Sequence, residues 1–77
     1  MCVEKMLKEK AERDLFLFWQ NYSEVICRKI QERKSFLIRS QCYNTANKND
    51  IVTKLQTMFT EIHSVYADED GIHILFV

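Results

Sequence analysis

The chain has 77 residues, with three Cys, one Gly and no Pro, and its 11 basic and 11 acidic side chains give a formal net charge of zero. This length allows one small domain and limits the core that the chain can bury. A composition that is 47% hydrophobic and 29% charged is close to the globular average and argues against a disordered tail. We therefore predict a single small domain over residues 1–77.

The longest apolar runs, residues 15–19 and 72–77, are far shorter than the roughly 20 residues that span a bilayer. Charged residues alternate through the first nine positions, where a secretory signal would carry an apolar segment. These features predict an intracellular protein of the cytoplasm or nucleus, with no membrane contact and with reduced thiols.

The first predicted element is a long helix over residues 3–35. Apolar residues recur every three or four positions from Val3 to Ile30, and no Gly or Pro interrupts this stretch. Opposite charges four positions apart, such as Glu4 with Lys8, add a few tenths of a kcal/mol each.

Five large apolar side chains follow one another at residues 15–19, so about half of the helix circumference is apolar there. Such a helix must be covered on most sides, and a chain this short has little left to cover it. We therefore predict an interface with another chain or a second copy, formed by Leu15, Phe16, Phe18, Trp19, Tyr22 and Ile26.

Residues 36–43 fit two structures. Their residue types favour a strand, whereas Leu37 and Ile38 also continue the helical spacing of the first helix. If the segment is a strand, the order becomes α-β-α-β, and residues 36–43 and 72–77 form a parallel crossover pair around the second helix.

A second amphipathic helix is predicted over residues 49–66, after a polar loop. Ile51, Leu55, Met58 and Phe59 lie on its apolar face, which continues to Val65 and Tyr66. Asp70-Gly71 is a turn dipeptide, and residues 72–77 are typical of a strand. The expected fold class is therefore mainly α or small α+β.

The sequence offers little support for catalysis or metal binding. The Cys and His residues lack the close spacing of a structural zinc site, and the one Gly cannot form a phosphate-binding loop. The acidic run at residues 68–70 is typical of a solvated turn. We predict no enzymatic activity, no catalytic or metal-binding residue and no cofactor.

Charge is distributed unevenly along the chain. Residues 1–40 hold nine basic and six acidic side chains, and residues 41–77 hold two and five, so the halves carry about +3 and −3. A basic cluster at the end of the first helix could contact nucleic-acid phosphates, but the helix dipole favours such a cluster in any case. Its members are Arg28, Lys29, Arg33 and Lys34.

One segment resembles a known family. A Thr precedes by five residues an Asp-Ile pair that opens a helix (Thr45, Asp50 and Ile51), which is similar to the loop-to-helix junction of histone-fold subunits. The resemblance implies a long central helix that ends near Gln41 and an obligate heterodimer partner. The chain lacks the break between a short first helix and the long one, and its C-terminus is strand-like.

Three functions remain open from the sequence. The leading hypothesis is a small non-enzymatic protein–protein interaction subunit that buries an apolar helix face against a partner chain. The second is a nucleic-acid-associated module, of histone-fold type, that uses the basic helix patch. The third is a truncated or short isoform of a longer domain, because the last strand pattern runs to the end of the sequence.

Overall fold

The computed structural model describes residues 3–76. It has an α+β fold, in agreement with the predicted class. The two α-helices and three strands are joined by two short 3₁₀ turns, in the order α1 (Val3–Glu32), β1 (Phe36–Arg39), η1 (Ser40–Cys42), η2 (Thr45–Asn47), α2 (Lys48–Met58), β2 (Ser64–Asp68) and β3 (Gly71–Leu75).

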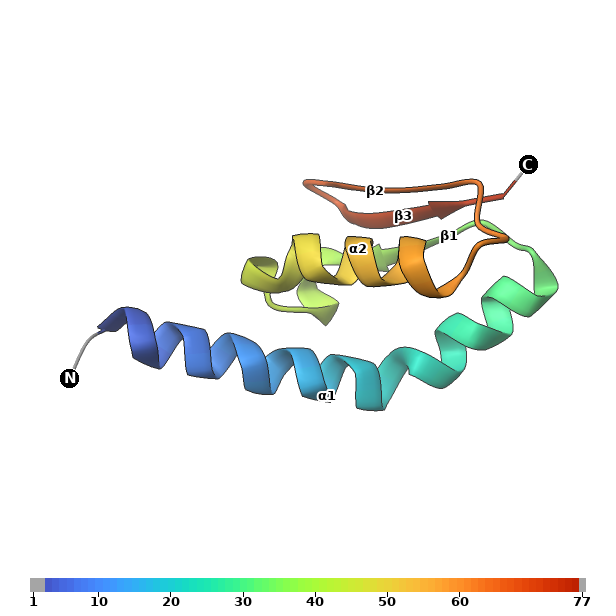
Figure 1. The fold of residues 1–77 in the computed structure, drawn as a ribbon. Helices are drawn as coiled ribbons and strands as arrows, with labels where there is room; N and C mark the ends of the chain where they lie inside the picture. The colour runs from blue at the N-terminus through green and yellow to red at the C-terminus, as the bar shows by residue number, and fades with distance from the viewer. Residues whose placement is uncertain (1–2, 77) are drawn as a thin grey trace.

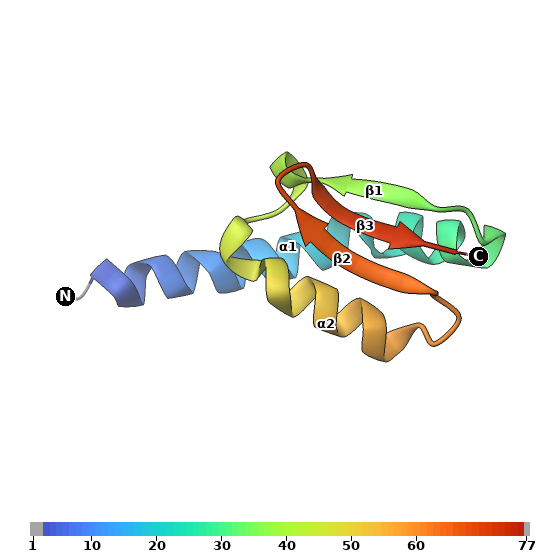
Figure 2. The same cartoon turned by 90° about the horizontal axis from the view of Figure 1, so that it is seen from above.

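The fold has two layers, with the sheet on one side and both helices on the other (Figure 1). Seen from above, α2 runs beside β2, while the C-terminal half of α1 passes under β1 and β3 (Figure 2). The N-terminal half of α1 continues past the end of the sheet, which gives the molecule its elongated dimensions of 47 × 23 × 21 Å. No helix within residues 3–76 is both long and apolar enough to cross a membrane.

The sheet is antiparallel, in the order β1-β3-β2. Central strand β3 places Ile72 opposite Ile38 and Ala67, and Ile74 opposite Phe36 and Val65. Because side chains alternate along a strand, these residues share the face that covers the helices. Ile72 and Ile74 are fully buried there, together with Ile51 and Leu55 of α2.

The predicted parallel pairing of residues 36–43 with 72–77 is wrong. Strands β1 and β2 both run antiparallel to β3, so they are parallel to each other. The crossover through α2 therefore links β1 to β2, and the hairpin then inserts β3 between them as a split βαβ unit. The extra strand β2 reverses the chain once more than the sequence prediction allowed.

Helix α1 confirms the predicted element, but it ends at Glu32 and not at residue 35. Arg33 takes a left-handed conformation with φ of 56°. Its N–H donates to the Ile30 carbonyl, and the Lys34 N–H donates to the Lys29 carbonyl, at 3.0 and 3.3 Å. This is the Schellman pattern of helix termination, with an arginine in the position that usually holds glycine.

The ambiguous segment 36–43 is a strand followed by a 3₁₀ turn. Phe36–Arg39 form β1, and residues Ser40–Cys42 form η1. The long helix ending near Gln41 that the histone-fold resemblance implies is therefore not present. Thr45–Asn47 form η2 before α2 begins, which agrees with the loop-to-helix junction only at this local level.

The second helix ends at Met58, eight residues before the predicted end at residue 66. Val65 and Tyr66 continue its apolar spacing in the sequence, yet they belong to β2. Pairing of β2 with β3 stabilises the alternative, because it satisfies the backbone groups of both strands and buries Val65. Gln56 of α2 also donates its Nε2–H to the Val65 carbonyl at 3.3 Å.

The predicted strand over residues 72–77 is confirmed as β3, which begins at Gly71 and ends at Leu75. Val77, the end of that prediction, lies outside the described residues. Gly71 has φ of 143°, and a Cβ at this position would collide with the backbone carbonyl oxygen of Ile38. The one glycine of the chain is therefore required both by its backbone conformation and by the close approach of β1.

Candidate functional site

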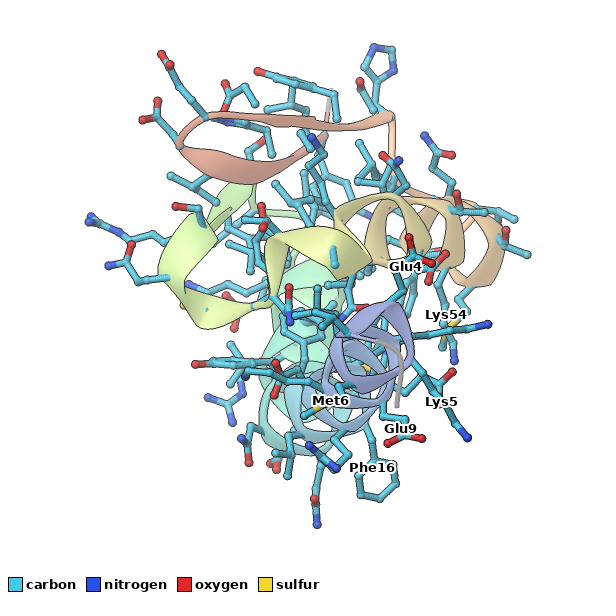
Figure 3. The ribbon with its side chains drawn as sticks, turned by 90° about the vertical axis from the view of Figure 1, so that its left-hand side faces the viewer. Glu4, Lys5, Met6, Glu9, Phe16 and Lys54 are labelled. Atoms are coloured by element: carbon cyan, nitrogen blue, oxygen red, sulfur yellow. The ribbon has the colours of Figure 1, made fainter. Side chains whose placement is uncertain are left out.

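Large apolar side chains are exposed on the side of α1 that faces away from the sheet. Phe16 is 68% exposed and Leu17 is 49% exposed, and Met58 from the end of α2, which lines a hollow together with Phe16, is 54% exposed. Figure 3, viewed toward the N-terminal end of α1, shows Phe16 pointing away from the sheet and from α2. We call Phe16, Leu17, Trp19 and Met58 the Phe16 surface.

Phe16 is shared by two open hollows on this surface. The N-terminal hollow, of about 530 Å³, is lined by Phe16 and Leu17 together with Glu9, Glu12 and Arg13. The C-terminal hollow, of about 400 Å³, lies between the two helices and is lined by Phe16, Trp19, Gln20, Ser23, Lys54 and Met58. An apolar side chain thus projects between two apolar depressions, one with an acidic rim and one with a basic rim.

Trp19 connects this surface to the core. Trp19 is half-buried, and its ring and the Phe18 ring form a T-shaped pair at a centroid distance of 5.1 Å. The Lys54 ammonium of α2 lies 5.4 Å from the Trp19 ring centroid, within the range of a cation–π contact. This contact holds the charged end of Lys54 at the rim of the C-terminal hollow.

The structure divides the six predicted interface residues into two groups. Phe16 is exposed, and Leu15, Trp19 and Tyr22 are half-buried against the core. Phe18 and Ile26 are only 3% and 2% exposed, because the sheet and α2 cover the face of α1 on which they lie. These two residues therefore belong to the core of this chain and present no surface to a partner.

Met58 was not among the predicted interface residues. Its spacing with Ile51 and Leu55 places it on the apolar face of a helix that was expected to run to residue 66. Because α2 ends at Met58, this side chain lies at the last turn and remains exposed beside α1. Apolar spacing alone therefore assigned Met58 to the core, and only the position of the helix end shows that it is exposed.

The four basic residues considered as phosphate contacts under the alternative hypothesis lie at the C-terminal end of α1 and just beyond it. Arg28 is 3.7 Å from the Glu24 carboxylate, and Lys34 is 3.5 Å from the Glu32 carboxylate. Lys29 is half-buried, and Arg33 occupies the left-handed position that ends the helix. Half of the positive charge is therefore balanced by a neighbouring carboxylate.

A polar cleft of about 440 Å³ lies between α1 and the loop before α2, with Asp14, Tyr22, Cys42 and Asn44 in its lining. The Asn44 side-chain amide donates to Asp14 at 2.9 Å, and Lys10 contacts the same carboxylate oxygen at 3.1 Å. Hydrogen bonding by Asn44 and then by Lys10 lowers the pKa of Asp14 below its ordinary value.

Buried Asn47 fixes the other end of this loop. Its side-chain amide donates to the Ala11 carbonyl of α1 at 2.8 Å, and only 4% of the residue is exposed. Together with the Asn44–Asp14 bond, this contact attaches the loop before α2 to the middle of α1. The two asparagines thus explain the position of α2 against α1, and with it the position of the C-terminal hollow.

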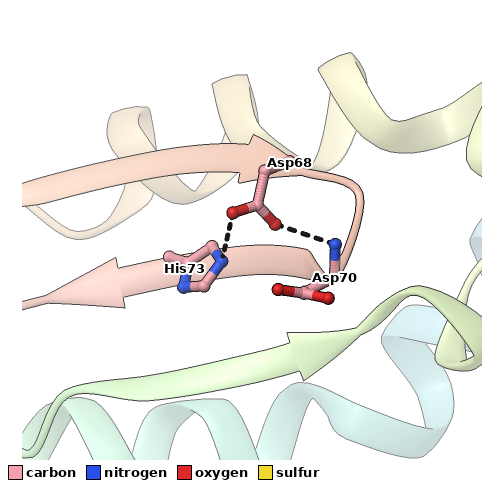
Figure 4. Close-up of side chains that lie close together, drawn as sticks. All are labelled: Asp68, Asp70 and His73. Atoms are coloured by element: carbon pink, nitrogen blue, oxygen red, sulfur yellow. Dashed lines mark hydrogen bonds and ion pairs between the residues drawn. The ribbon is translucent and has the colours of Figure 1, made fainter.

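The turn between β2 and β3 brings together Asp68, Asp70 and His73 (Figure 4). The His73 Nε2 is shielded from solvent and lies 2.8 Å from Asp68 Oδ2. Asp68 Oδ1 accepts from the Asp70 and Gly71 backbone N–H groups, at 2.9 and 3.3 Å. Burial favours a higher pKa for Asp68, but hydrogen bonding by His73, Asp70 and Gly71 outweighs this effect, so its pKa lies below the ordinary value.

Within residues 3–76, this is the group of side chains that could hold a metal ion, since one ligand atom from each lies within 4.8 Å of the others. Both Asp68 oxygens already serve the hairpin, and the Tyr66 ring stacks on His73 at a centroid distance of 4.7 Å. These contacts explain why Asp68, Asp70 and His73 lie close together: they stabilise the turn between β2 and β3. The sequence prediction missed the Asp68–His73 contact because it placed Tyr66 in a helix.

No protein-family model, curated protein or solved structure matches this chain.

Proposed function

We propose that this protein is a small, non-enzymatic interaction subunit that binds another protein chain through the Phe16 surface. The exposure of Phe16 carries the proposal: a phenyl side chain with two-thirds of its area in water stands between two apolar hollows. Burying such a side chain is worth about 1.5–3 kcal/mol, which gives a partner a reason to cover it.

The composition of the surface supports this role. Aromatic residues and Met are enriched at the centres of protein interfaces, where a few buried anchors supply most of the binding energy. Here Phe16 is the projecting anchor, Trp19 and Met58 line the depression beside it, and Glu9, Glu12, Arg13 and Lys54 supply the charged part of the two linings. An apolar centre with a charged rim is the usual arrangement of a protein-binding surface.

The rigidity of the surface also favours binding. Phe16 and Trp19 are fixed by a helix that is anchored in the core through Phe18, and the Asn47 contact with Ala11 holds α2 beside it. A preformed surface loses little conformational entropy when a partner binds. In this proposal the Asp68–His73 contact stabilises the hairpin and takes no part in a reaction.

The proposal can be tested by site-specific photo-crosslinking. A photoreactive phenylalanine analogue at position 16 should form adducts with a binding partner in extracts of the expressing cells, and the same analogue at Val25 serves as the control. Val25 is also an exposed apolar residue of α1, but it lies outside both hollows.

The partner identified by mass spectrometry is then purified and its binding is measured directly. We expect Phe16→Ser to weaken that binding by about 10- to 100-fold, which corresponds to the loss of one buried phenyl side chain. Val25→Ser should leave it unchanged. Equal adduct yields from positions 16 and 25, or unchanged binding by Phe16→Ser, would contradict the proposal.

A further inference from the structure

We infer that the partner on the Phe16 surface is a second copy of this chain, packed with its α1 antiparallel to the first around a two-fold axis close to Phe16. This inference rests on the proposed function and adds the identity and the orientation of the partner. Its basis is that the Phe16 surface is complementary to itself in shape and in charge.

Shape complementarity follows from the order of the features along α1. The two hollows lie on either side of Phe16, one toward the N-terminus of the helix and one toward its C-terminus. Antiparallel packing, with the two-fold axis between Phe16 and Trp19 of each α1, places the Phe16 side chain of each copy opposite the C-terminal hollow of the other. Each Phe16 then meets the depression lined by Trp19 and Met58 of the second copy, and at about 400 Å³ that depression has ample room for a phenyl ring.

Charge complementarity selects the same arrangement. The rim of the N-terminal hollow carries Glu9, Glu12 and Arg13, a net charge of −1, whereas the rim of the C-terminal hollow carries Lys54. Figure 3 shows Glu9 next to Phe16 and Lys54 extending to the right of α1. In the antiparallel pair, Glu9 and Glu12 of each copy face Lys54 of the other. A parallel pair would instead set like charges against each other.

The exposed part of α1 is long enough for such an interface. Met6, 54% exposed, lies ten residues before Phe16, a separation of about 15 Å along the helix. A stable interface buries about 800 Å² on each partner, which is roughly one-seventh of the 5686 Å² surface of this chain. A pair of helices this long can supply that area without any change in the fold.

Sedimentation equilibrium of the purified protein provides the first test. We expect a concentration-dependent mass that approaches twice 9.3 kDa at high concentration. Phe16→Ser removes both symmetry-related phenyl contacts, so the dimer dissociation constant should rise by about 100-fold or more. Val25→Ser is the matched control and should leave it unchanged. A wild-type protein that remains monomeric at about 1 mM would overturn the inference.

Charge reversal tests the antiparallel orientation. Lys54→Glu places acidic groups against acidic groups at both rims, and the double variant Glu9→Lys with Glu12→Lys places basic groups against basic groups. Each variant alone should dimerise about tenfold more weakly than wild type at low salt. Mixing the two restores opposite charges at both rims, so they should form a heterodimer of wild-type affinity. A mixture that binds no better than its components would overturn the orientation.

The two tests separate this inference from the proposed function. A monomeric wild type that is still crosslinked through position 16 to a different protein supports the interaction surface and excludes the second copy. A monomer with no specific adduct at position 16 contradicts both. Circular dichroism of each variant checks that the exposed substitutions leave the helical content unchanged.

Discussion

The two halves of α1 belong to one continuous helix, but they have different relations to the rest of the chain. Residues 18–32 lie under the sheet and bury Phe18, Ile26 and Ile30. Residues 3–17 extend past the sheet and contain no buried residue, although Val3, Met6, Leu7 and Phe16 lie among them. The N-terminal half contacts the loop before α2 through Ala11 and Asp14.

This difference shows that a segment can be helical without contributing buried residues to the core. The N-terminal half is helical because it continues a packed helix and contains no Gly or Pro, so each added residue only propagates the helix. Its exposed apolar residues contribute nothing to the folding of the chain itself. The N-terminal half supports the fold through Leu15, Ala11 and Asp14, but its other apolar side chains remain exposed and are free to contact another chain, which is the basis of the proposals above.

The largest expected effect is in the sheet that covers the packed half of α1. Gly71→Ala introduces a methyl group that collides with the Ile38 carbonyl, at a backbone conformation that L-residues rarely adopt. We expect a loss of about 4 kcal/mol or more, enough to unfold a domain of this size. Thermal unfolding followed by circular dichroism measures this. A cooperative transition at the wild-type temperature would show that β1 does not approach β3 this closely.

A matched pair of alanine substitutions compares the two halves directly. Ile26→Ala leaves a cavity in the core and should cost about 2–5 kcal/mol, whereas Leu7→Ala changes an exposed side chain and should cost under about 0.5 kcal/mol. Urea denaturation of both variants, at concentrations where the chain is monomeric, gives the two values. Similar losses would mean that the N-terminal half is packed against the core after all.

The junction between α1 and β1 offers a stabilising change. Arg33 has a positive φ that is unfavourable for a residue with a Cβ, and Gly adopts it without strain. Arg33→Gly should therefore raise the free energy of unfolding by up to about 1 kcal/mol, or a few degrees in melting temperature. Gln31→Gly, inside the last turn of the helix, is the control and should instead destabilise it.

The smallest effect is expected from acid titration of the two surface carboxylates with lowered pKa values. Asp14 and Asp68 stabilise the folded state above the ordinary carboxyl pKa near 4, and this contribution is lost as the pH falls through their lower folded-state pKa values. The melting temperature should therefore fall below about pH 4, and less steeply in Asp14→Asn and Asp68→Asn than in wild type.

Amide hydrogen exchange of the same two variants distinguishes an effect on the N-terminal half of α1 from an effect on the β2–β3 hairpin. Asp14→Asn should speed exchange in the N-terminal half of α1, because it weakens the contact with Asn44. Asp68→Asn should act on the β2–β3 hairpin alone. An unchanged pH dependence in both variants would show that neither carboxylate is linked to folding.

Local patterns in the sequence were sufficient for the presence of both helices and for the last strand, but they extended the second helix eight residues too far. The type of α1 follows from apolar spacing, the start of α2 follows from the polar loop before it, and the Asp70-Gly71 turn correctly marks the beginning of β3. The end of α1 was less well defined, because Arg33 stops the helix without the glycine that would have marked the position. An arginine in the sequence gives no indication that its backbone adopts a left-handed conformation.

The strand β2 and the sheet topology depend on contacts between distant residues. Val65 and Tyr66 fit a helix by spacing, and only pairing with Ile74 and His73 of β3 makes them a strand. The same limit applies to the candidate site. The sequence marked residues 15–19 as too apolar to be covered by this chain, but only the position of the sheet separates exposed Phe16 from buried Phe18.

The intrinsic fluorescence of Trp19 can be used to detect binding at the Phe16 surface. It is the one tryptophan in the sequence, half in contact with the core and half in the wall of the C-terminal hollow. An indole with one side in water emits at longer wavelength than one that is fully enclosed, and the nearby Lys54 ammonium perturbs the same ring. Occupation of the hollow should therefore shift the intrinsic fluorescence to the blue without any added label.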